Sequence, residues 1–147
     1  MQNVAKALAK FHALVPDIPR DASNPYFKSK YAPLETILPT IKEPLQKCEL
    51  VFTQIPSGLN RLKTLVIHVP TGEFIQGEYE VTPAKNDPQG QGSALTYMRR
   101  YALVAMLGLN TEEDDDGTSA SEVPVVKRSA PSPDPVADKK ALNDMEL

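Results

Sequence analysis

Three short runs of β-branched and aliphatic residues, separated by turn-forming residues, occupy the middle of the chain and constrain its fold most strongly. The runs are Leu50–Ile55, Leu62–Val69 and Phe74–Val81. Pro-Ser-Gly-Leu-Asn-Arg separates the first two runs, and Pro-Thr-Gly-Glu separates the second from the third. Such segments favour tight turns between neighbouring strands. The pattern predicts a three-stranded antiparallel β-meander, and alternate side chains of the third run are expected on opposite faces.

Helical spacing of apolar residues predicts two helices before this meander. The first covers residues 2–15 and ends at Pro16. The second covers residues 33–48, but Pro39 and Pro44 lie inside it. An internal proline removes a backbone hydrogen bond, so we expect a kink or two short helical pieces. With a third helix after the meander, the predicted fold class is α+β, a meander packed with two to three helices.

The third predicted helix follows a polar, glycine-rich segment at residues 83–92, which we expect to form a mobile loop. The helix begins at Gly92 and Ser93 and ends at Leu107, before Gly108. At helical spacing one side carries Ser93, Thr96 and Arg100, with Arg99 close beside them. The opposite, packing side carries Ala94, Met98, Tyr101, Ala102 and Ala105.

This helix has the chemistry of a phosphate-binding surface. Guanidinium groups offer two donors at a fixed charge, and neighbouring hydroxyls add neutral hydrogen bonds to phosphate oxygens. We therefore expect the polar side, with Tyr97, to hold a nucleic-acid backbone. The alternative is that Arg99 and Arg100 only solvate the surface or pair with Glu78 and Glu80.

A second aromatic and basic cluster lies in residues 24–31, where prolines and turn formers predict an extended, looped segment. Aromatic rings stack on unpaired bases of any sequence, while lysines follow the phosphates. The cluster therefore favours single strands, with Tyr31 facing inward and Lys28 and Lys30 outward. The alternative is that the aromatic residues, which include Tyr26 and Phe27, cap the core.

Charge is divided unevenly along the chain, whose formal net charge is −3. Residues 1–110 contain 12 Lys and Arg against 9 Asp and Glu, whereas residues 111–147 contain 4 against 10. An acidic tail can compete for a basic binding surface or recruit another protein. Few residues after Asn110 are suited to burial, so we expect a core of residues 1–117 and a disordered, acidic Pro/Ser-rich tail of residues 118–147.

Little in the sequence supports an enzyme. His12 and His68 have no recognisable catalytic partner nearby in sequence, and the single cysteine, Cys48, excludes an intramolecular disulfide and a cysteine-based zinc site. Carboxylates at residues 112–116 suit magnesium or calcium, which leaves a metal-dependent nuclease as a remote alternative, although a contiguous acidic run is a poor cage. The chain has no bilayer-spanning apolar run and no secretory signal at its N-terminus, which predicts a cytoplasmic protein without a membrane partner.

Several segments of the chain form a specific combination: NPYFKSKY followed by APLETIL, then LVFTQ, a turn at TGE, and QGSALTYMRRYALVAMLGLNTEEDDDG. Together they resemble the Erf (essential recombination function) family of phage single-strand annealing proteins. The resemblance extends over about residues 1–117, and its last segment is long enough to be specific. It implies a fold related to the cores of other annealing proteins.

The resemblance also implies a function. The protein would be a phage recombination protein in a bacterial host that binds single-stranded DNA and pairs complementary strands without ATP or another cofactor. It would act as a ring or helical homo-oligomer, with subunit contacts through the sheet edges or the first helix. The chain has no G-x-x-x-x-G-K-[ST] phosphate loop, in agreement with ATP-independent annealing.

Under this hypothesis the third helix and residues 24–31 form two walls of a DNA groove. The expected DNA-binding residues are Ser93, Thr96, Tyr97, Arg99, Arg100, Tyr26, Lys28 and Lys30, with Arg61 and Lys63 as weaker candidates. The alternative function is a module that coats single strands without annealing them. The tail is a candidate site for a host single-strand-binding protein. The sequence leaves open which of Arg99 and Arg100 faces DNA.

Overall fold

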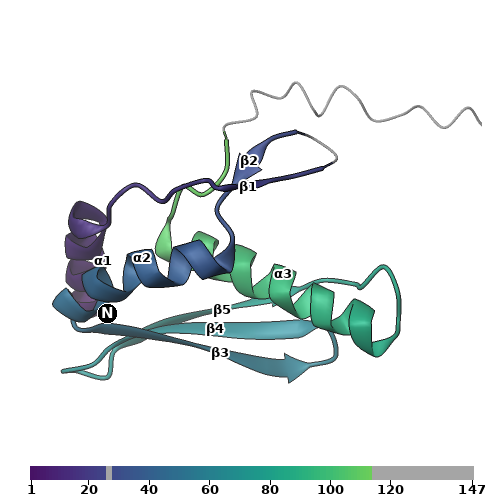
Figure 1. The fold of residues 1–147 in the computed structure, drawn as a ribbon. Coiled ribbons are helices and arrows are strands. Elements are labelled where there is room, and N and C mark those ends of the chain that lie inside the picture. The colour runs from purple at the N-terminus through teal and green to yellow at the C-terminus, as the bar shows by residue number, and fades with distance from the viewer. Residues whose placement is uncertain (26–27, 114–147) are drawn as a thin grey trace, which may run out of the picture. The chain divides into compact units, whose positions relative to one another are not determined.

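The predicted meander is present as an antiparallel sheet in the order β3-β4-β5 (Figure 1). Its strands are β3 (Leu50–Gly58), β4 (Arg61–His68) and β5 (Phe74–Glu80). The structure is a computed structural model and describes residues 1–25 and 28–113, so the predicted tail and the boundary at residue 117 lie outside the described residues. The first strand is longer than predicted, because β3 continues to pair with β4 past a register shift between Pro56 and Gly58.

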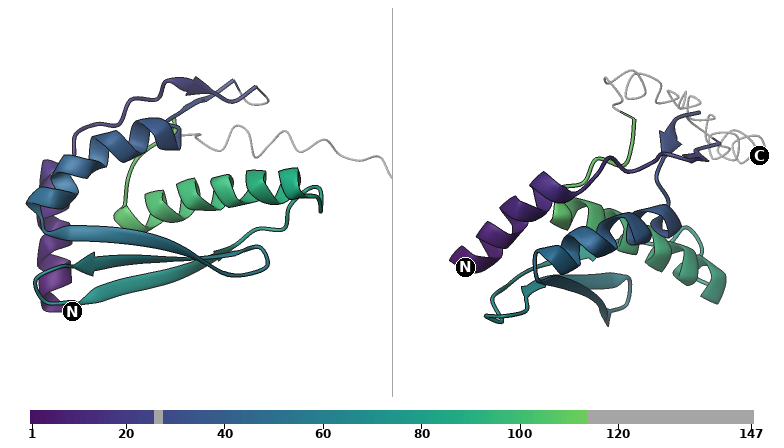
Figure 2. Two further views of the ribbon diagram at one scale, coloured as in Figure 1. Left: turned by 60° about the horizontal axis from the view of Figure 1, so that its bottom comes forward. Right: turned by 60° about the vertical axis from the view of Figure 1, so that its left-hand side comes forward.

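Three helices pack against this sheet, α1 (Gln2–Leu14), α2 (Leu34–Lys47) and α3 (Pro88–Leu107). Helices α2 and α3 cover one face of the sheet, and α1 stands at its end (Figures 1 and 2). Helix α2 packs on β3 and α3 packs on β4 and β5, whereas α1 contacts α2, β3 and β4. The architecture is therefore α+β, as predicted.

The core lies between the helices and the inner face of the sheet. All three helices contribute side chains that are essentially inaccessible to solvent, among them Phe11, Ile37, Ile41, Leu103 and Leu107. The central strand alternates, because Leu62, Thr64 and Val66 are buried whereas the intervening residues face the other side. Burial of each large apolar side chain contributes roughly 1.5–3 kcal/mol, so the packing of helices on this face accounts for much of the stability.

Helix α2 runs without interruption from Leu34 to Lys47, so the expectation of two helical pieces is wrong. Pro39 and Pro44 each remove one backbone hydrogen bond, but the helix buries Ile37, Ile41 and Leu45 on one side. Packing of that apolar side outweighs the local cost, since most helical stability in proteins comes from tertiary contacts.

Helix α3 begins at Pro88, so the predicted start at Gly92 is wrong and the loop before it is shorter than expected. Asp87 caps the helix, because its Oδ1 accepts a hydrogen bond from the Gly90 N–H at 2.6 Å. Pro88 follows at the first helical position, where no N–H is needed. The helix ends as predicted before Gly108, whose φ of 63° is the left-handed conformation of a helix C-terminus.

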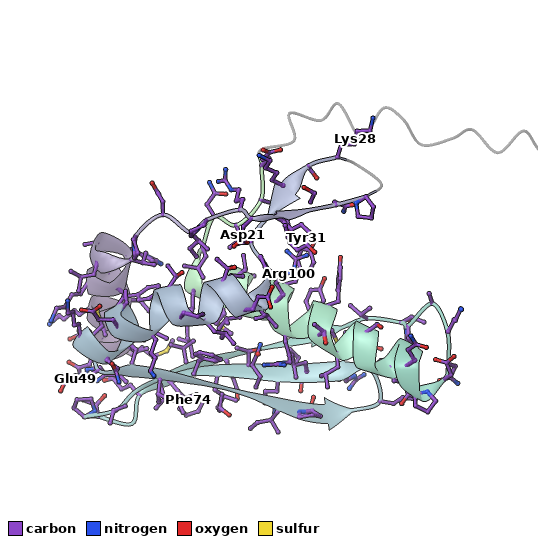
Figure 3. All side chains as sticks on the ribbon, viewed as in Figure 1. Asp21, Lys28, Tyr31, Glu49, Phe74 and Arg100 are labelled. Carbon is purple, nitrogen blue, oxygen red and sulfur yellow. The ribbon has the colours of Figure 1, made fainter. Side chains whose placement is uncertain are left out.

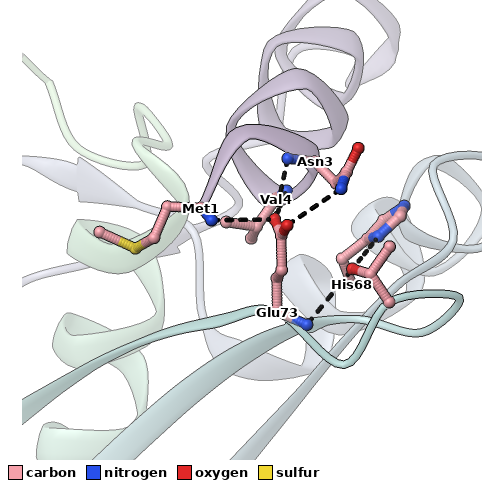
Figure 4. A network of polar contacts seen from close by, with 6 residues as sticks. Met1, Asn3, Val4, His68 and Glu73 are labelled. Atoms are coloured by element: carbon pink, nitrogen blue, oxygen red, sulfur yellow. Dashed lines mark hydrogen bonds and ion pairs between the residues drawn. The ribbon is translucent and has the colours of Figure 1, made fainter.

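The start of α1 is capped by a carboxylate from the turn between β4 and β5 (Figure 4). Glu73 Oε2 accepts hydrogen bonds from the backbone N–H groups of Asn3 at 2.8 Å and Val4 at 3.0 Å. Its Oε1 accepts from Asn3 Nδ2 at 2.9 Å, and the terminal amine of Met1 lies 3.4 Å from Oε2. The hydrogen bond from Val4 is the largest of the effects that lower the pKa of Glu73 to about 2.

We expect this cap to make the protein sensitive to acid. A carboxyl group whose pKa falls from 4.5 to about 2 on folding stabilises the folded state above pH 4.5, and this contribution is lost as the pH falls to about 2. The melting temperature of the wild type should therefore fall more steeply over this range than that of Glu73→Gln. Equal slopes would contradict the proposed role of the carboxylate.

The segment that was predicted to be extended and looped includes a small antiparallel sheet, β1 (Ala22–Ser23) with β2 (Lys30–Tyr31). The chain after α3 runs beside it. The Ala32 N–H donates to Thr111 O at 2.8 Å, the Glu113 N–H donates to Lys30 O at 3.3 Å, and Tyr31 and Glu112 form an isolated β-bridge. These contacts bring residues 111–113, here called the return segment, next to β2.

Candidate nucleic-acid interface

Arg100 lies between two tyrosine rings, and its charge is paired. Its Cζ lies 4.6 Å from the ring centroid of Tyr31 and 4.3 Å from that of Tyr101. Its Nη1 donates to Glu112 Oε1 at 3.0 Å, and the arginine side chain is only 14% exposed. The guanidinium therefore joins α3, β2 and the return segment, and Figure 3 shows Tyr31 and Arg100 together between these elements.

Glu112 replaces the partners that the sequence suggested for the arginines. Glu78 and Glu80 pair instead with Lys63 and Arg61 across the sheet, so the alternative in which either carboxylate pairs with Arg100 is wrong. Glu78 and Glu80 are close to α3 in the sequence, but side chains alternate along β5 and these two carboxylates lie on the face of the sheet away from the helix. Proximity in sequence therefore did not identify the partner of Arg100.

Tyr101 extends the cluster around Arg100. Its ring centroid lies 4.2 Å from that of Tyr97, one helical turn earlier. Burial, followed by a hydrogen bond with Glu112, raises the pKa of Tyr101 to about 12, so the phenol stays neutral at physiological pH. Tyr101 and Ala105 were both predicted to lie on the packing side of α3, but Tyr101 is half-buried and Ala105 is exposed. In the last turns of the helix the buried side carries Leu103 and Leu107 instead.

Arg99 differs from its neighbour in that its side chain is exposed. Among residues 1–25 and 28–113 the structure shows no ion pair for this guanidinium. The Arg99 backbone is held in place, since its carbonyl accepts a hydrogen bond from Gln54 Nε2 of β3 at 3.0 Å. Gln54 also donates to Thr64 Oγ1 at 3.1 Å and so ties this turn of α3 to the sheet. Arg99 is thus the arginine whose donors are available to a ligand.

The role of Gln54 was not anticipated from the sequence. Side chains alternate along β3, so Gln54 lies on the inner face of the sheet together with Phe52 and not with Thr53 and Ile55. This alternation could have identified Gln54 from the sequence. A polar residue on the side of a strand that faces a helix requires a partner, and the Arg99 carbonyl and the Thr64 hydroxyl satisfy it.

The hydroxyl groups of α3 have different environments. Thr96 Oγ1 donates to Gly92 O at 3.1 Å, so its proton is engaged within the helix and does not point to a phosphate in this structure. Ser93 is exposed, and with Tyr97 it lines a cavity of about 590 Å³ beside the first turns of α3. The polar side of the helix is therefore divided between the cavity, the Arg100 cluster and the exposed Arg99.

Lys28 and Lys30 are exposed on the β1–β2 hairpin, as predicted, and Tyr31 is half-buried against Arg100. Lys28 lies at the far end of the hairpin from α3 (Figure 3) and has a φ of 53°. Tyr26, the third predicted contact in this segment, and Phe27 lie outside the described residues. The contact between Tyr31 and Arg100 does bring β2 next to α3, which the two-walled groove requires.

Arg61 and Lys63 are not part of this arrangement. They alternate with the buried Leu62 and so lie on the face of the sheet opposite α3. Arg61 Nε lies 3.3 Å from Glu80 Oε2, and Lys63 Nζ lies 3.8 Å from Glu78 Oε1. Cross-strand ion pairs at this exposure contribute little to stability, and here they mark the outer face of the sheet.

No group of three or more potential metal ligands occurs in the part of the chain that the structure describes. Of the acidic run, Glu112 pairs with Arg100 and Glu113 Oε2 accepts from the Lys30 N–H at 3.2 Å, while residues 114–116 lie outside the described residues. His12 Nε2 lies 2.9 Å from Leu107 O, and His68 Nδ1 lies 2.8 Å from Thr71 Oγ1.

None of the described helices is both long enough and apolar enough to cross a bilayer.

Comparison with known protein families gives a match over most of the chain. The family model described as the ERF superfamily matches residues 4–143, which is most of the chain. Neither a curated protein nor a solved structure matches this chain.

Proposed function

Because this chain belongs to the ERF superfamily, a family with general roles in recombination and strand annealing, we propose that it binds single-stranded DNA and pairs complementary strands without ATP. The proposal includes a homo-oligomer, so that a short groove on each subunit forms a longer track. It also includes a phage origin and a role for residues 118–147 in contacting a host single-strand-binding protein.

The observation that carries this proposal is the exposed guanidinium of Arg99 on a helix turn that Gln54 holds against the sheet. A fixed backbone with a free bidentate donor is suited to gripping a phosphate. Lys28 and Lys30 on the neighbouring hairpin supply further exposed positive charge. Contacts of this kind hold the backbone of a strand and carry no sequence preference, as annealing of any complementary pair requires.

Annealing requires little chemistry beyond the binding of the phosphates. If the phosphates are held, the bases remain free to meet a second strand, and no bond is made or broken by the protein. Neutralised phosphates also reduce the repulsion between two strands, since each bound cation offsets one negative charge.

We expect Arg99→Ala to weaken binding of a labelled oligonucleotide about tenfold and to lower the slope of log K against log salt by about one. The affinity should be measured across a salt series by fluorescence anisotropy, and annealing of two complementary oligonucleotides should be measured without ATP. Lys42→Ala is the matched control, because it removes an exposed positive charge from α2.

The outcomes separate the candidate functions. Binding with faster annealing, both weakened in Arg99→Ala only, supports the proposal. Binding without faster annealing indicates a coating module instead. If the wild type does not bind single-stranded DNA, the proposed function is wrong.

A further inference from the structure

A cavity of about 590 Å³ lies between the end of β5, the loop of residues 81–87 and the first turns of α3. Its volume is within the range of about 300–1,000 Å³ that is typical of small-molecule sites. Tyr79 and Tyr97 contribute aromatic surface, and Val81, Pro83 and Ala94 contribute aliphatic surface. The polar lining residues are Thr82, Lys85, Asp87, Gln89 and Ser93.

These walls suit a flat, weakly polar ring better than an anion. Tyr97 remains 45% exposed although it is a large aromatic residue, so one of its surfaces has no protein partner in the described part of the chain. The carboxylate of Asp87 lines the same cavity and disfavours a phosphate within it. The Ser93 hydroxyl and the Gln89 amide offer both donors and acceptors, which match the edge of a nucleobase.

The cavity is continuous with the interface already described. Tyr97 lines the cavity and contacts Tyr101, with 4.2 Å between the ring centroids and 37° between the ring planes. Tyr101 in turn lies against the guanidinium of Arg100. Lys85 is exposed beside the cavity and can approach a phosphate adjoining a bound base. Arg99 is two residues from Tyr97 on α3 and therefore points to a different side of the helix, so a strand held by both residues would pass across α3.

We propose that this cavity receives one unstacked base of a bound single strand, against the rings of Tyr79 and Tyr97. This inference rests on the proposed function, since it assigns a base-binding site to the same DNA-binding surface. The site would hold one base of each bound segment out of the stack, with stacking as the main attraction and no requirement for a particular base.

The test uses the full chain and an oligothymidylate carrying single 5-iododeoxyuridine substitutions. After irradiation, the cross-linked peptide is identified by mass spectrometry, and we expect it to contain Tyr79 or Tyr97. In parallel, Tyr97→Leu should weaken oligothymidylate binding roughly five- to tenfold without changing the salt slope. Tyr97→Phe, which keeps the ring, should bind within about twofold of the wild type.

The results distinguish failure of this inference from failure of the proposed function. If the wild type binds the oligonucleotide but cross-links elsewhere, and Tyr97→Leu binds normally, the cavity does not hold a base although DNA binding stands. A changed oligomeric mass of Tyr97→Leu with unchanged affinity would instead assign the cavity to a subunit contact. Because cross-linking uses the wild type, it decides the question even if the variant misfolds.

Discussion

Gly90→Ala is expected to destabilise the protein by about 3 kcal/mol, near the upper end for overpacked sites. A Cβ at this position would lie 2.0 Å from the carbonyl oxygen of Lys85 and 2.9 Å from its carbonyl carbon. Both are backbone atoms, so no side-chain rotation relieves the clash. Either the loop of residues 81–87 or the capped first turn of α3 must move.

Gly92→Ala is the matched control in the same helix. A Cβ at Gly92 would meet nothing within 4 Å, and alanine has the higher helix propensity. This variant should be more stable than the wild type by up to about 1 kcal/mol. Urea denaturation of the three proteins measures both effects, and equal stabilities would contradict the close approach of Lys85 to α3. Since Gly90 also lines the cavity, its variant should lose the specific cross-link.

The second large effect is expected for Arg100→Met, which should lower stability by about 2 kcal/mol. Methionine keeps the aliphatic stem but removes the guanidinium between Tyr31 and Tyr101 and leaves Glu112 without its ion-pair partner. Arg99→Met removes the same group from an exposed position and should change stability by less than about 0.5 kcal/mol.

Hydrogen exchange locates this effect in the structure. The Ala32 N–H is bonded to Thr111 O, so its exchange reports whether the return segment stays beside β2. It should exchange faster in Arg100→Met and at the wild-type rate in Arg99→Met. If the two variants are equally stable and equally protected, Arg100 does not fasten these elements, and its guanidinium is then as available to DNA as that of Arg99.

Local sequence signals predicted the elements well where their causes are local. The meander follows from β-branched runs and turn residues, and the end of α3 follows from Gly108, because these preferences depend on neighbouring residues. The start of α3 was predicted wrongly because the sequence contains two possible start signals. The helix starts at Asp87 and Pro88 and not at Gly92 and Ser93. Asp87 followed by Pro88 has the pattern of an N-cap residue followed by a first-turn proline, which the sequence already showed.

The candidate site depends on contacts between distant parts of the chain. The sequence placed Arg99 and Arg100 side by side on one helix and identified the aromatic and basic segment that contains Tyr31, but it could not assign different roles to the two arginines. That difference arises because Gln54 of β3 holds the turn at Arg99, whereas Tyr31 and Glu112 enclose Arg100.

By itself, then, the sequence determined the α+β elements, the family and the helix that carries the arginines. Only the tertiary structure decided which guanidinium is free, which carboxylate caps α1 and which residues line the cavity beside α3. The physical reason is that helix and strand preferences act over a few neighbouring residues, whereas burial and charge pairing depend on which distant segments pack together.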